Sequence, residues 1–291
     1  MISININSHK LGGNLILEDI SMSVPDGKVL GLVGTNGSGK STLLRLMSGV
    51  YVPDSGSVQY DGEDVTIPRV RENIFFLPDD PFFAGQTTGK GIFDIYKTFY
   101  PNLDLELYRT LLSRFKLDEN AHQRNFSKGM RRQFYIALAL SARPKYLLLD
   151  EAFDGLDAFT KKTVIEEINR AVEENDSTVV ISSHALSELE TFCDLYALIE
   201  GQTVKSHGSL EEHAAKYSRY TLAFTEAPDP AIFSHLNVRD IDFRGKFVTL
   251  TLEGDPDKLY ESLLALNPAV IDREKLSFED VFITDVKGGR S

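Results

Sequence analysis

The chain has 291 residues, of which 42% are hydrophobic and 25% charged, so it can form one large domain or a large and a small one. No run approaches the roughly 20 apolar residues that cross a bilayer, and the N-terminus has no signal-peptide pattern. The single cysteine, Cys193, excludes an internal disulfide framework, and the net charge of -12 argues against a nucleic-acid groove. We therefore expect a cytoplasmic protein with no nucleic-acid partner.

Short apolar runs predict strands in the first two thirds of the chain, and helical patterns separate them. The predicted strands are Val29–Val33, Ile74–Leu77, Tyr146–Leu149 and Thr178–Ser182, and the clearest helices are Ser41–Met47 and Lys161–Val172. Between Phe82 and Pro144 helices replace the strands. Because strands that alternate with helices form mostly parallel sheets, we predict an α/β core with a helical subdomain at about 82–144.

The first motif with chemical content is GTNGSGKS, Gly34–Ser41, which matches G-x-x-x-x-G-K-[ST] in full. It follows a predicted strand and opens a predicted helix, where backbone N–H groups and the helix dipole bind phosphate. Lys40 is expected to reach the β- and γ-phosphates, Ser41 to hold Mg²⁺, and Thr42 to support the α-phosphate side. The predicted nucleotide-binding residues are Gly34, Asn36, Gly37, Ser38, Gly39, Lys40, Ser41 and Thr42. The loop predicts a P-loop NTPase core and leaves GTPases, kinases and motors open.

A second anion site is predicted at the start of the helix within Asn125–Pro144, where Ser127 and Gly129 stand beside free N–H groups. This helix start lies a few residues before the strand Tyr146–Leu149, so it cannot easily fold onto its own phosphate loop. We infer that it serves a phosphate held by another subunit.

Two adjacent carboxylates follow the apolar run YLLL, at the strand tip where ligands bind in open α/β sheets. Asp150 is expected to hold the Mg²⁺ shell, and Glu151 to polarise the attacking water. His184 ends the strand TVVISSH, where a neutral imidazole can hydrogen-bond a γ-phosphate. With Lys40, these residues make up the predicted catalytic centre.

Towards the C-terminus the pattern changes to two alternating strand segments, RYTLAFT and DIDFRGKFVTLTLEG, the second folding back at Arg244–Lys246. Helices are predicted at Ala231–Leu236 and Lys258–Ala265. This order of elements predicts a small ferredoxin-like α+β domain at 217–291, with the boundary around Lys205–Lys216.

Together these residues resemble the ATP-binding cassette (ABC) ATPases, over roughly Ile2 to Leu210. The family's parts occur here in its order: the phosphate loop Gly34–Thr42, a loop at Pro78–Asp79, a signature at Phe126–Met130, then Asp150–Glu151, Asp154–Asp157 and His184. The resemblance implies an ATPase domain at 1–210 that uses ATP and Mg²⁺. The domain at 217–291 would then be an accessory or regulatory unit.

In that family two subunits close head to tail around two ATP molecules. Carried over to this chain, Ser127 and Gly129 of one subunit would touch the γ-phosphate bound by Lys40 of the other. Asp157 would lie at the dimer seam, and His184 would act as the switch. Closure would drive a separate multi-span membrane permease, so the resemblance implies a homodimer or heterodimer attached to the inner face of the cell membrane.

Three positions depart from the family's common pattern. The tyrosine that usually stacks on adenine falls at Leu11, which removes aromatic stacking. The loop glutamine falls at Asp79, which can still ligate Mg²⁺ or water and is expected to be both a metal ligand and a catalytic residue. The signature reads FSKGM, with Lys128 and Met130 in place of Gly and Gln. None of these departures by itself predicts an inactive enzyme.

The FSKGM signature and the C-terminal LSFEDVFITDV, Leu276–Val286, look like the ATPase subunits of bacterial exporters. The chain's size and extra C-terminal unit are similar to exporters of small amphipathic peptides or antimicrobial compounds. A rival hypothesis is a soluble ABC ATPase that acts on a macromolecular complex, but the chain has one phosphate loop and no long heptad arms. A small-molecule kinase is a second rival, for which Ser127, Gly129 and His184 have no use.

Aromatic residues cluster after the Asp79 loop, and the resemblance implies that part of this surface receives the permease. The cluster consists of Phe82, Phe83, Phe93, Tyr96, Phe99 and Tyr100. We expect at least four of the six rings to belong to the core of the helical subdomain. Phe82 or Phe83 is expected to be exposed.

Overall fold

The computed structural model describes residues 1–291 except 82–84, 185, 275, 278 and 282–291. The chain divides into two compact units, which are described separately: Met1–Ala185 with Phe192–His207, and Leu186–Thr191 with Gly208–Ser291. Within the described ranges, no helix combines the length and hydrophobicity needed to span a bilayer. The division into domains at 1–210 and 217–291 stays a prediction.

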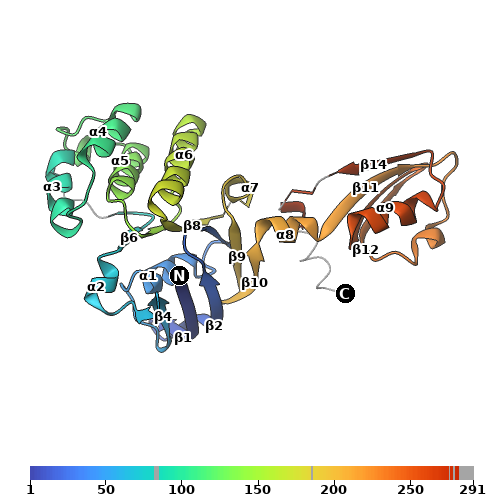
Figure 1. Ribbon diagram of the computed structural model, residues 1–291, viewed down its shortest axis with the longest axis horizontal. Coiled ribbons are helices and arrows are strands. Elements are labelled where there is room, and N and C mark those ends of the chain that lie inside the picture. Colours follow the sequence, from blue (N-terminus) through green and yellow to red (C-terminus); the bar gives the residue numbers. More distant parts are fainter. Residues whose placement is uncertain (82–84, 185, 275, 278, 282–291) are drawn as a thin grey trace. The chain divides into compact units, whose positions relative to one another are not determined.

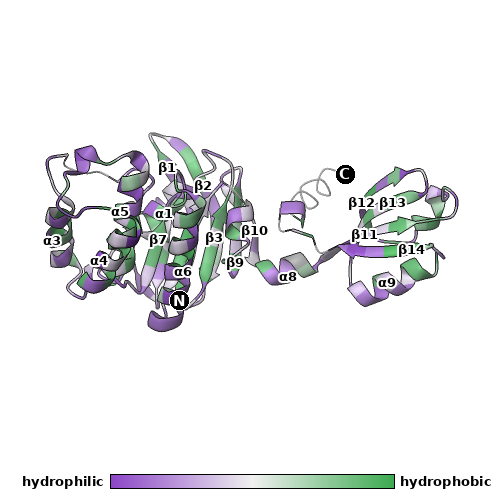
Figure 2. Cartoon of the chain, turned by 90° about the horizontal axis from the view of Figure 1, so that it is seen from above, coloured by the Kyte–Doolittle hydropathy of each residue, from purple (hydrophilic) through white to green (hydrophobic). Residues whose placement is uncertain are grey.

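A six-stranded sheet with the order β10-β9-β3-β8-β7-β6 forms the centre of the first unit (Figure 1). Its strands are β3 Val29–Val33, β6 Ile74–Leu77, β7 Tyr146–Leu149, β8 Thr178–Ser183, β9 Leu195–Glu200 and β10 Thr203–Ser209. The pairs β3–β8, β3–β9, β7–β8 and β6–β7 are parallel. Every residue of β3, β7 and β8 is buried, which explains their unbroken apolar runs, and Figure 2 colours β3 and β7 mostly as hydrophobic. The predicted parallel core is confirmed.

A four-stranded sheet with the order β2-β1-β4-β5 forms the second layer of this unit. Its strands are β1 Ile2–Leu11, β2 Asn14–Val24, β4 Ser55–Tyr60 and β5 Glu63–Asp64, and all its pairs are antiparallel. Helix α1 (Lys40–Met47) shares one buried cluster with Ile4 of this sheet and Leu148 of the parallel sheet. This core fixes the N-terminus of α1, which immediately follows the phosphate loop.

Helices replace strands between β6 and β7, as predicted. The helices of this unit are α2 Pro68–Arg71, α3 Gly89–Phe99, α4 Leu105–Arg114, the 3₁₀ turn η1 Gln123–Asn125, α5 Lys128–Ser141 and, after β7, α6 Ala158–Asn175. Helices α3 to α6 begin after Thr88, Asp104, Ser127 and Asp157, whose side chains accept a backbone N–H of the first turn. Among the clustered aromatic residues, Phe93 is buried, Tyr96 and Tyr100 are partly buried, and Phe99 is 68% exposed. Phe82 and Phe83 lie outside the described residues.

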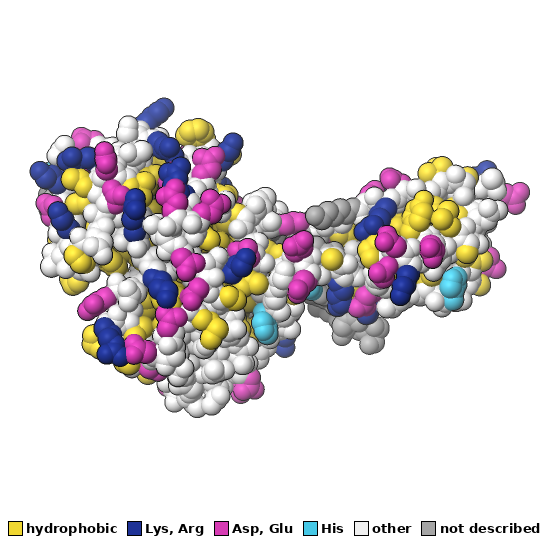
Figure 3. Space-filling model, viewed as in Figure 1, with side chains coloured by type: hydrophobic (Ala, Val, Ile, Leu, Met, Phe, Trp, Pro, Cys, Tyr) yellow, Lys and Arg dark blue, Asp and Glu magenta, His cyan; other side chains and the backbone are white. Residues whose placement is uncertain are grey.

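The second unit contains a four-stranded antiparallel sheet with the order β12-β13-β11-β14. Its elements are α7 Leu186–Leu189, α8 Leu210–Ala215, β11 Tyr217–Ala223, η2 Pro230–Phe233, β12 Val238–Arg244, β13 Phe247–Glu253, α9 Pro256–Leu264 and β14 Val270–Glu274. The strand order and antiparallel pairing are those of a ferredoxin-like fold. Hydrophobic side chains reach the surface over α9, where Tyr260 and Leu264 are 41% and 51% exposed (Figure 3).

The helix predicted at Ala231–Leu236 is wrong. A single 3₁₀ turn forms instead, because the amides of Ile232, Ser234 and Leu236 each bond to the carbonyl three residues back. The connection between β11 and β12 therefore contains a 3₁₀ turn in place of an α-helix. The helix predicted at Lys258–Ala265 is confirmed as α9.

The described part of the C-terminal segment packs against the small sheet. Leu276 and Val281 form a buried cluster with Tyr217, and the Asp280 carboxylate pairs with Arg219 at 3.2 Å. Phe278 and Phe282 lie outside the described residues. The segment resembling an exporter C-terminus therefore has a structural contact at Tyr217.

An ion-pair cluster joins the two sheets of the first unit. Asp61, in the turn after β4, accepts hydrogen bonds from Lys145 Nζ and the Tyr146 hydroxyl, both at 2.8 Å. The hydrogen bond from Lys145 holds the pKa of Asp61 well below its ordinary value of 3.8. The ring of Tyr146 packs on Tyr60 with centroids 4.5 Å apart. This cluster fixes the start of β7 and therefore the strand that carries Asp150.

We expect Asp61→Asn to lower the Tm of the first unit by about 1–3 °C at pH 7, because it removes two partly exposed pairs, with Lys145 and with the N-terminal ammonium of Met1. Since the pKa of Asp61 is lowered on folding, its stabilisation is present above pH 3.8 and is lost as pH falls through the lowered pKa. The difference from wild type should stay constant from pH 7 to 5 and shrink below pH 4 in urea unfolding. Glu63→Gln, which removes an exposed pair with Arg69, is the control. A difference that grows on acidification would contradict this role.

Candidate nucleotide site

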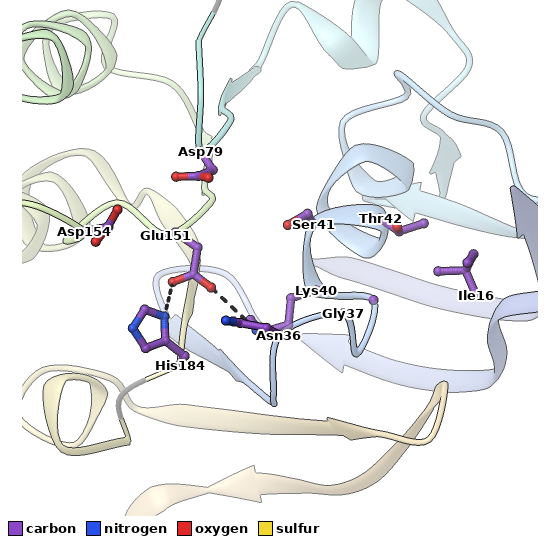
Figure 4. Close-up of a pocket in the computed structure, with 11 residues that line it drawn as sticks. Ile16, Asn36, Gly37, Lys40, Ser41, Thr42, Asp79, Glu151, Asp154 and His184 are labelled. Carbon is purple, nitrogen blue, oxygen red and sulfur yellow. Dashed lines mark hydrogen bonds and ion pairs between the residues drawn. The ribbon is translucent and has the colours of Figure 1, made fainter. Parts of the chain in front are cut away.

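A pocket of about 580 Å³ lies where β3, β6, β7 and β8 end (Figure 4). The predicted residues that line it are Asn36, Gly37, Gly39, Lys40, Ser41, Thr42, Asp79, Glu151 and His184. Ile16 of β2 and Asp154 also line it, and neither was assigned a role from the sequence. Leu11, the position of the missing tyrosine, ends β1 and does not line the pocket. The apolar side chain that lines the pocket from this sheet is that of Ile16.

The phosphate loop depends on glycines at two close approaches. Gly39 has φ of 108°, and a Cβ there would come 2.7 Å from a methyl of Leu17. A Cβ on Gly34 would come 2.4 Å from the Ile199 carbonyl oxygen. Lys40 is 5% exposed, and its amine donates to the Gly34 carbonyl at 2.8 Å. The loop therefore holds a buried cation at its centre.

The Asp150 carboxylate is completely buried at the tip of β7. Its Oδ1 accepts hydrogen bonds from the hydroxyls of Ser41 at 3.1 Å and Ser182 at 2.7 Å. Within the described part of the chain, its Oδ2 is buried and has no hydrogen-bond partner. Burying such an oxygen is costly without a cation. A hydroxyl and a carboxylate oxygen are hard ligands, so this pair fits Mg²⁺.

Glu151 lies between two basic groups. Its Oε1 is 3.5 Å from the Lys40 amine, and its Oε2 is 3.0 Å from His184 Nδ1 (Figure 4). Its backbone has φ of 49°, and its N–H donates to the Ser182 hydroxyl at 2.9 Å. Ser182, which the sequence analysis missed, therefore holds both carboxylate-bearing residues of the β7 tip. The Glu151 side chain is 16% exposed, so it is reachable from the pocket.

Two basic residues of α5 pair with pocket carboxylates, and neither pair was predicted. Lys128 Nζ is 2.7 Å from Asp154 Oδ2, and Arg132 Nη2 is 2.5 Å from Asp79 Oδ1. Lys128 and Arg132 are four residues apart, on one face of the helix. The pairs link the signature helix to the pocket wall.

Ser127 and Gly129 do not line the pocket of their own chain. Ser127 is exposed and caps α5 by accepting the Met130 N–H at 3.2 Å. A Cβ on Gly129 would come 3.1 Å from the Gly155 carbonyl, so the signature packs closely on the loop after β7. Asp157 caps α6 through the Thr160 N–H. A role for Ser127 and Gly129 towards another subunit stays a prediction.

The family model described as ABC transporter matches residues 17–154. Over all 291 residues the chain is 32% identical to the ABC transporter ATP-binding protein YtrB of Bacillus subtilis, spanning 99% of that protein. The chain belongs to the ABC transporter ATP-binding proteins. It is also 31% identical over 229 residues to the methionine import ATP-binding protein MetN of Clostridium tetani, covering 73% of this chain and 70% of that one. A solved structure titled "Structure of ATP binding subunit of ABC transporter" superposes with a TM-score of 0.67 at 25% identity, covering 73% of this chain and 91% of that one.

As an ABC transporter ATP-binding subunit, the chain is an ATPase. Subunits of this family act with membrane permease components, generally as dimers. The family membership rejects the small-molecule kinase hypothesis. The relatives include an importer, so the similarity by itself leaves the direction of transport open.

We expect Lys128→Met to raise the pKa of Asp154 towards its ordinary value of 3.8. The hydrogen bond from Lys128 is the largest cause that lowers the pKa of this carboxyl in the wild type. The measurement is a ¹³C NMR titration of the Asp154 carboxyl in wild type, Lys128→Met and Lys128→Arg. Lys128→Arg keeps the charge and should keep the low pKa. An unchanged pKa in Lys128→Met would show that the pair does not form in solution.

Proposed function

We propose that this ABC ATPase powers export of a small amphipathic peptide or an antimicrobial compound through a separate multi-span permease. Two such subunits, identical or different, work on the cytoplasmic side at the inner face of the membrane. The observation that carries the ATPase half is that Lys40, Ser41 and Glu151 line one pocket, with the buried Asp150 carboxylate bonded to Ser41 directly behind it. The FSKGM signature and the small C-terminal unit support export. The similarity to YtrB spans the whole chain, whereas that to MetN covers 73% of it.

The residues of the pocket divide the work of ATP hydrolysis. The loop amides of Gly34–Gly39 and the Lys40 amine bind the β- and γ-phosphates. Ser41 and Asp150 would hold Mg²⁺, which would neutralise phosphate charge. Glu151 accepts a proton from the attacking water, and Ser182 fixes its backbone. His184 Nδ1 contacts the Glu151 carboxylate. An imidazole that also bonds to the γ-phosphate would therefore link the position of the general base to the presence of that phosphate.

The signature contributes to the site of the second subunit. Ser127 presents its hydroxyl at the surface, outside its own pocket, at the N-terminus of the 14-residue helix α5. A helix start of this kind binds an anion through its free N–H groups and dipole. We propose that Ser127 and Gly129 bind the γ-phosphate held by Lys40 of the partner subunit.

An aromatic hollow on the first unit is the proposed permease contact. Pro68 and Arg71 of α2 face Tyr96, Phe99 and Tyr100 of α3 and its C-terminus across a pocket of about 710 Å³. The rings of Tyr96 and Tyr100 stack 6.3 Å apart, and Phe99 is 68% exposed. Exposed aromatic patches rimmed by charge are typical of protein-binding surfaces. We propose that a cytoplasmic helix of the permease docks in this hollow.

We expect Glu151→Gln to keep the affinity for ATP within about threefold and to lower kcat by roughly 10²–10⁴-fold, because it removes the proton acceptor. Lys40→Ala should weaken ATP binding by more than about tenfold, because it removes the cation at the loop centre. The measurements are equilibrium binding of a fluorescent ATP analogue and phosphate release. Glu173→Gln, an exposed change on α6, is the control. Normal turnover by Glu151→Gln would refute the role of Glu151.

We expect the tagged Glu151→Gln chain, purified from native membranes with ATP in mild detergent, to retain a multi-span membrane protein. Phe99→Asp in that background should lose this partner, because it places a charge in the aromatic hollow. Val52→Asp, at another apolar side chain that is 61% exposed, should keep it. Recovery of ribosomes, or of nothing from the membrane, would reject the transport function and leave the ATP chemistry unchanged.

A further inference from the structure

The guanidinium of Arg132 is a buried cation at the tip of β7. The residue is 2% exposed, and its two terminal nitrogens point to different elements. Nη1 donates to the Asp150 carbonyl at 3.1 Å, and Nη2 donates to Asp79 Oδ1 at 2.5 Å. One side chain of α5 therefore joins the loop after β6 to the tip of β7.

The charge of Arg132 requires a carboxylate at residue 79. A buried guanidinium is strongly destabilising unless an acid neutralises it. The Asp150 carboxylate accepts hydrogen bonds from Ser41 and Ser182. Arg132 bonds to the backbone carbonyl of Asp150 and not to its carboxylate. Asp79 supplies the charge, and a neutral glutamine at this position could not. The unusual acid in this loop and the arginine of α5 therefore form one unit.

The pair also determines what Asp79 can do in the pocket. Its side chain is 48% exposed and lines the nucleotide pocket, but Oδ1 is held by Arg132. Arg132 lies one turn after Lys128, whose amine pairs with Asp154, another residue of the pocket wall. Both ties end on α5, whose first turn carries Ser127 and Gly129. Two charged contacts therefore connect the pocket wall to the helix that carries the signature.

We propose that Arg132 is a positioning residue: by holding Asp79 it fixes the start of α5 relative to the nucleotide, and Asp79 serves Arg132 rather than Mg²⁺. The proposal rests on the ATPase mechanism proposed above. It replaces the expectation from the sequence that Asp79 is a metal ligand. It also assigns a role to an arginine that no motif of the sequence singled out.

The test compares Arg132→Gln, Asp79→Asn, the double variant and Arg132→Lys in the full chain. We expect each neutralising single variant to lower kcat by about tenfold or more, with the Kd for ATP changed less than about threefold. The double variant should be no slower than either single one, because no unpaired buried charge remains. Arg132→Lys, which keeps a positive charge facing the Asp79 carboxylate, should retain most of the activity. Asp80→Asn, at the exposed neighbouring acid, is the control.

Magnesium titration separates the two roles of Asp79. If Asp79 serves Arg132, Asp79→Asn leaves the Mg²⁺ concentration for half-maximal activity within about twofold of wild type. A large rise in that concentration in Asp79→Asn, but not in Arg132→Gln, would overturn the proposal. Losses of kcat that multiply in the double variant would also overturn it.

Two checks keep the result decisive. If Arg132→Gln does not fold, Asp79→Gln and Arg132→Lys replace it, because the Asp79 side chain is half exposed and lysine preserves the charge. A wild-type chain that neither binds nor hydrolyses ATP would reject the proposed function itself. If the wild type is active and the kcat losses of the Arg132 and Asp79 variants multiply in the double variant, only the pairing of Arg132 with Asp79 is rejected.

Discussion

The buried Asp150 carboxylate is the constraint on which the nucleotide site depends. Two elements bond to this carboxylate, α1 through the Ser41 hydroxyl and β8 through the Ser182 hydroxyl, and α5 bonds to the backbone carbonyl of the same residue through Arg132. A buried carboxylate is stable only where hydrogen bonds and a cation offset its desolvation. Within the described residues its Oδ2 has no hydrogen-bond partner, so a metal ion bound there would stabilise the fold at the same point where it would serve the reaction.

Those parts of the site that are local in sequence could be predicted from it. The phosphate loop, the cap at Ser127 and the carboxylates after β7 depend on neighbours a few residues away, so their spacing determines their geometry. Arg132 and Asp79 are 53 residues apart, and Lys128 and Asp154 are 26 apart. Such pairs depend on how α5 packs on the sheet, which no local pattern records. The one sequence signal for these pairs was the spacing of Lys128 and Arg132, which places two basic side chains on one face of α5.

The second unit illustrates the same distinction. A ferredoxin-like unit was predicted from the order of its elements along the chain, and the sheet order β12-β13-β11-β14 is that of such a fold. The first helix was predicted from composition, but the bonds at η2 are those of a 3₁₀ turn. β14, with the sequence VIDRE, was missed because three of its five residues are charged. It forms because it pairs along β11, from Ala223 to Arg219, and not because of its own propensity.

Charge balance in the pocket couples ATP binding to the position of the general base. The Lys40 amine donates to the carbonyls of Gly34 and Thr35 and faces Glu151 at 3.5 Å. Bound phosphate oxygens would compete for this amine and would weaken its hold on Glu151, whose other carboxylate oxygen contacts His184. Asp79 and Asp154 would repel the same phosphates if they were not neutralised from α5. Because those neutralising cations lie on the helix that carries the signature, the same residues would set both the electrostatics of one pocket and the position of the surface that we propose is offered to a second subunit.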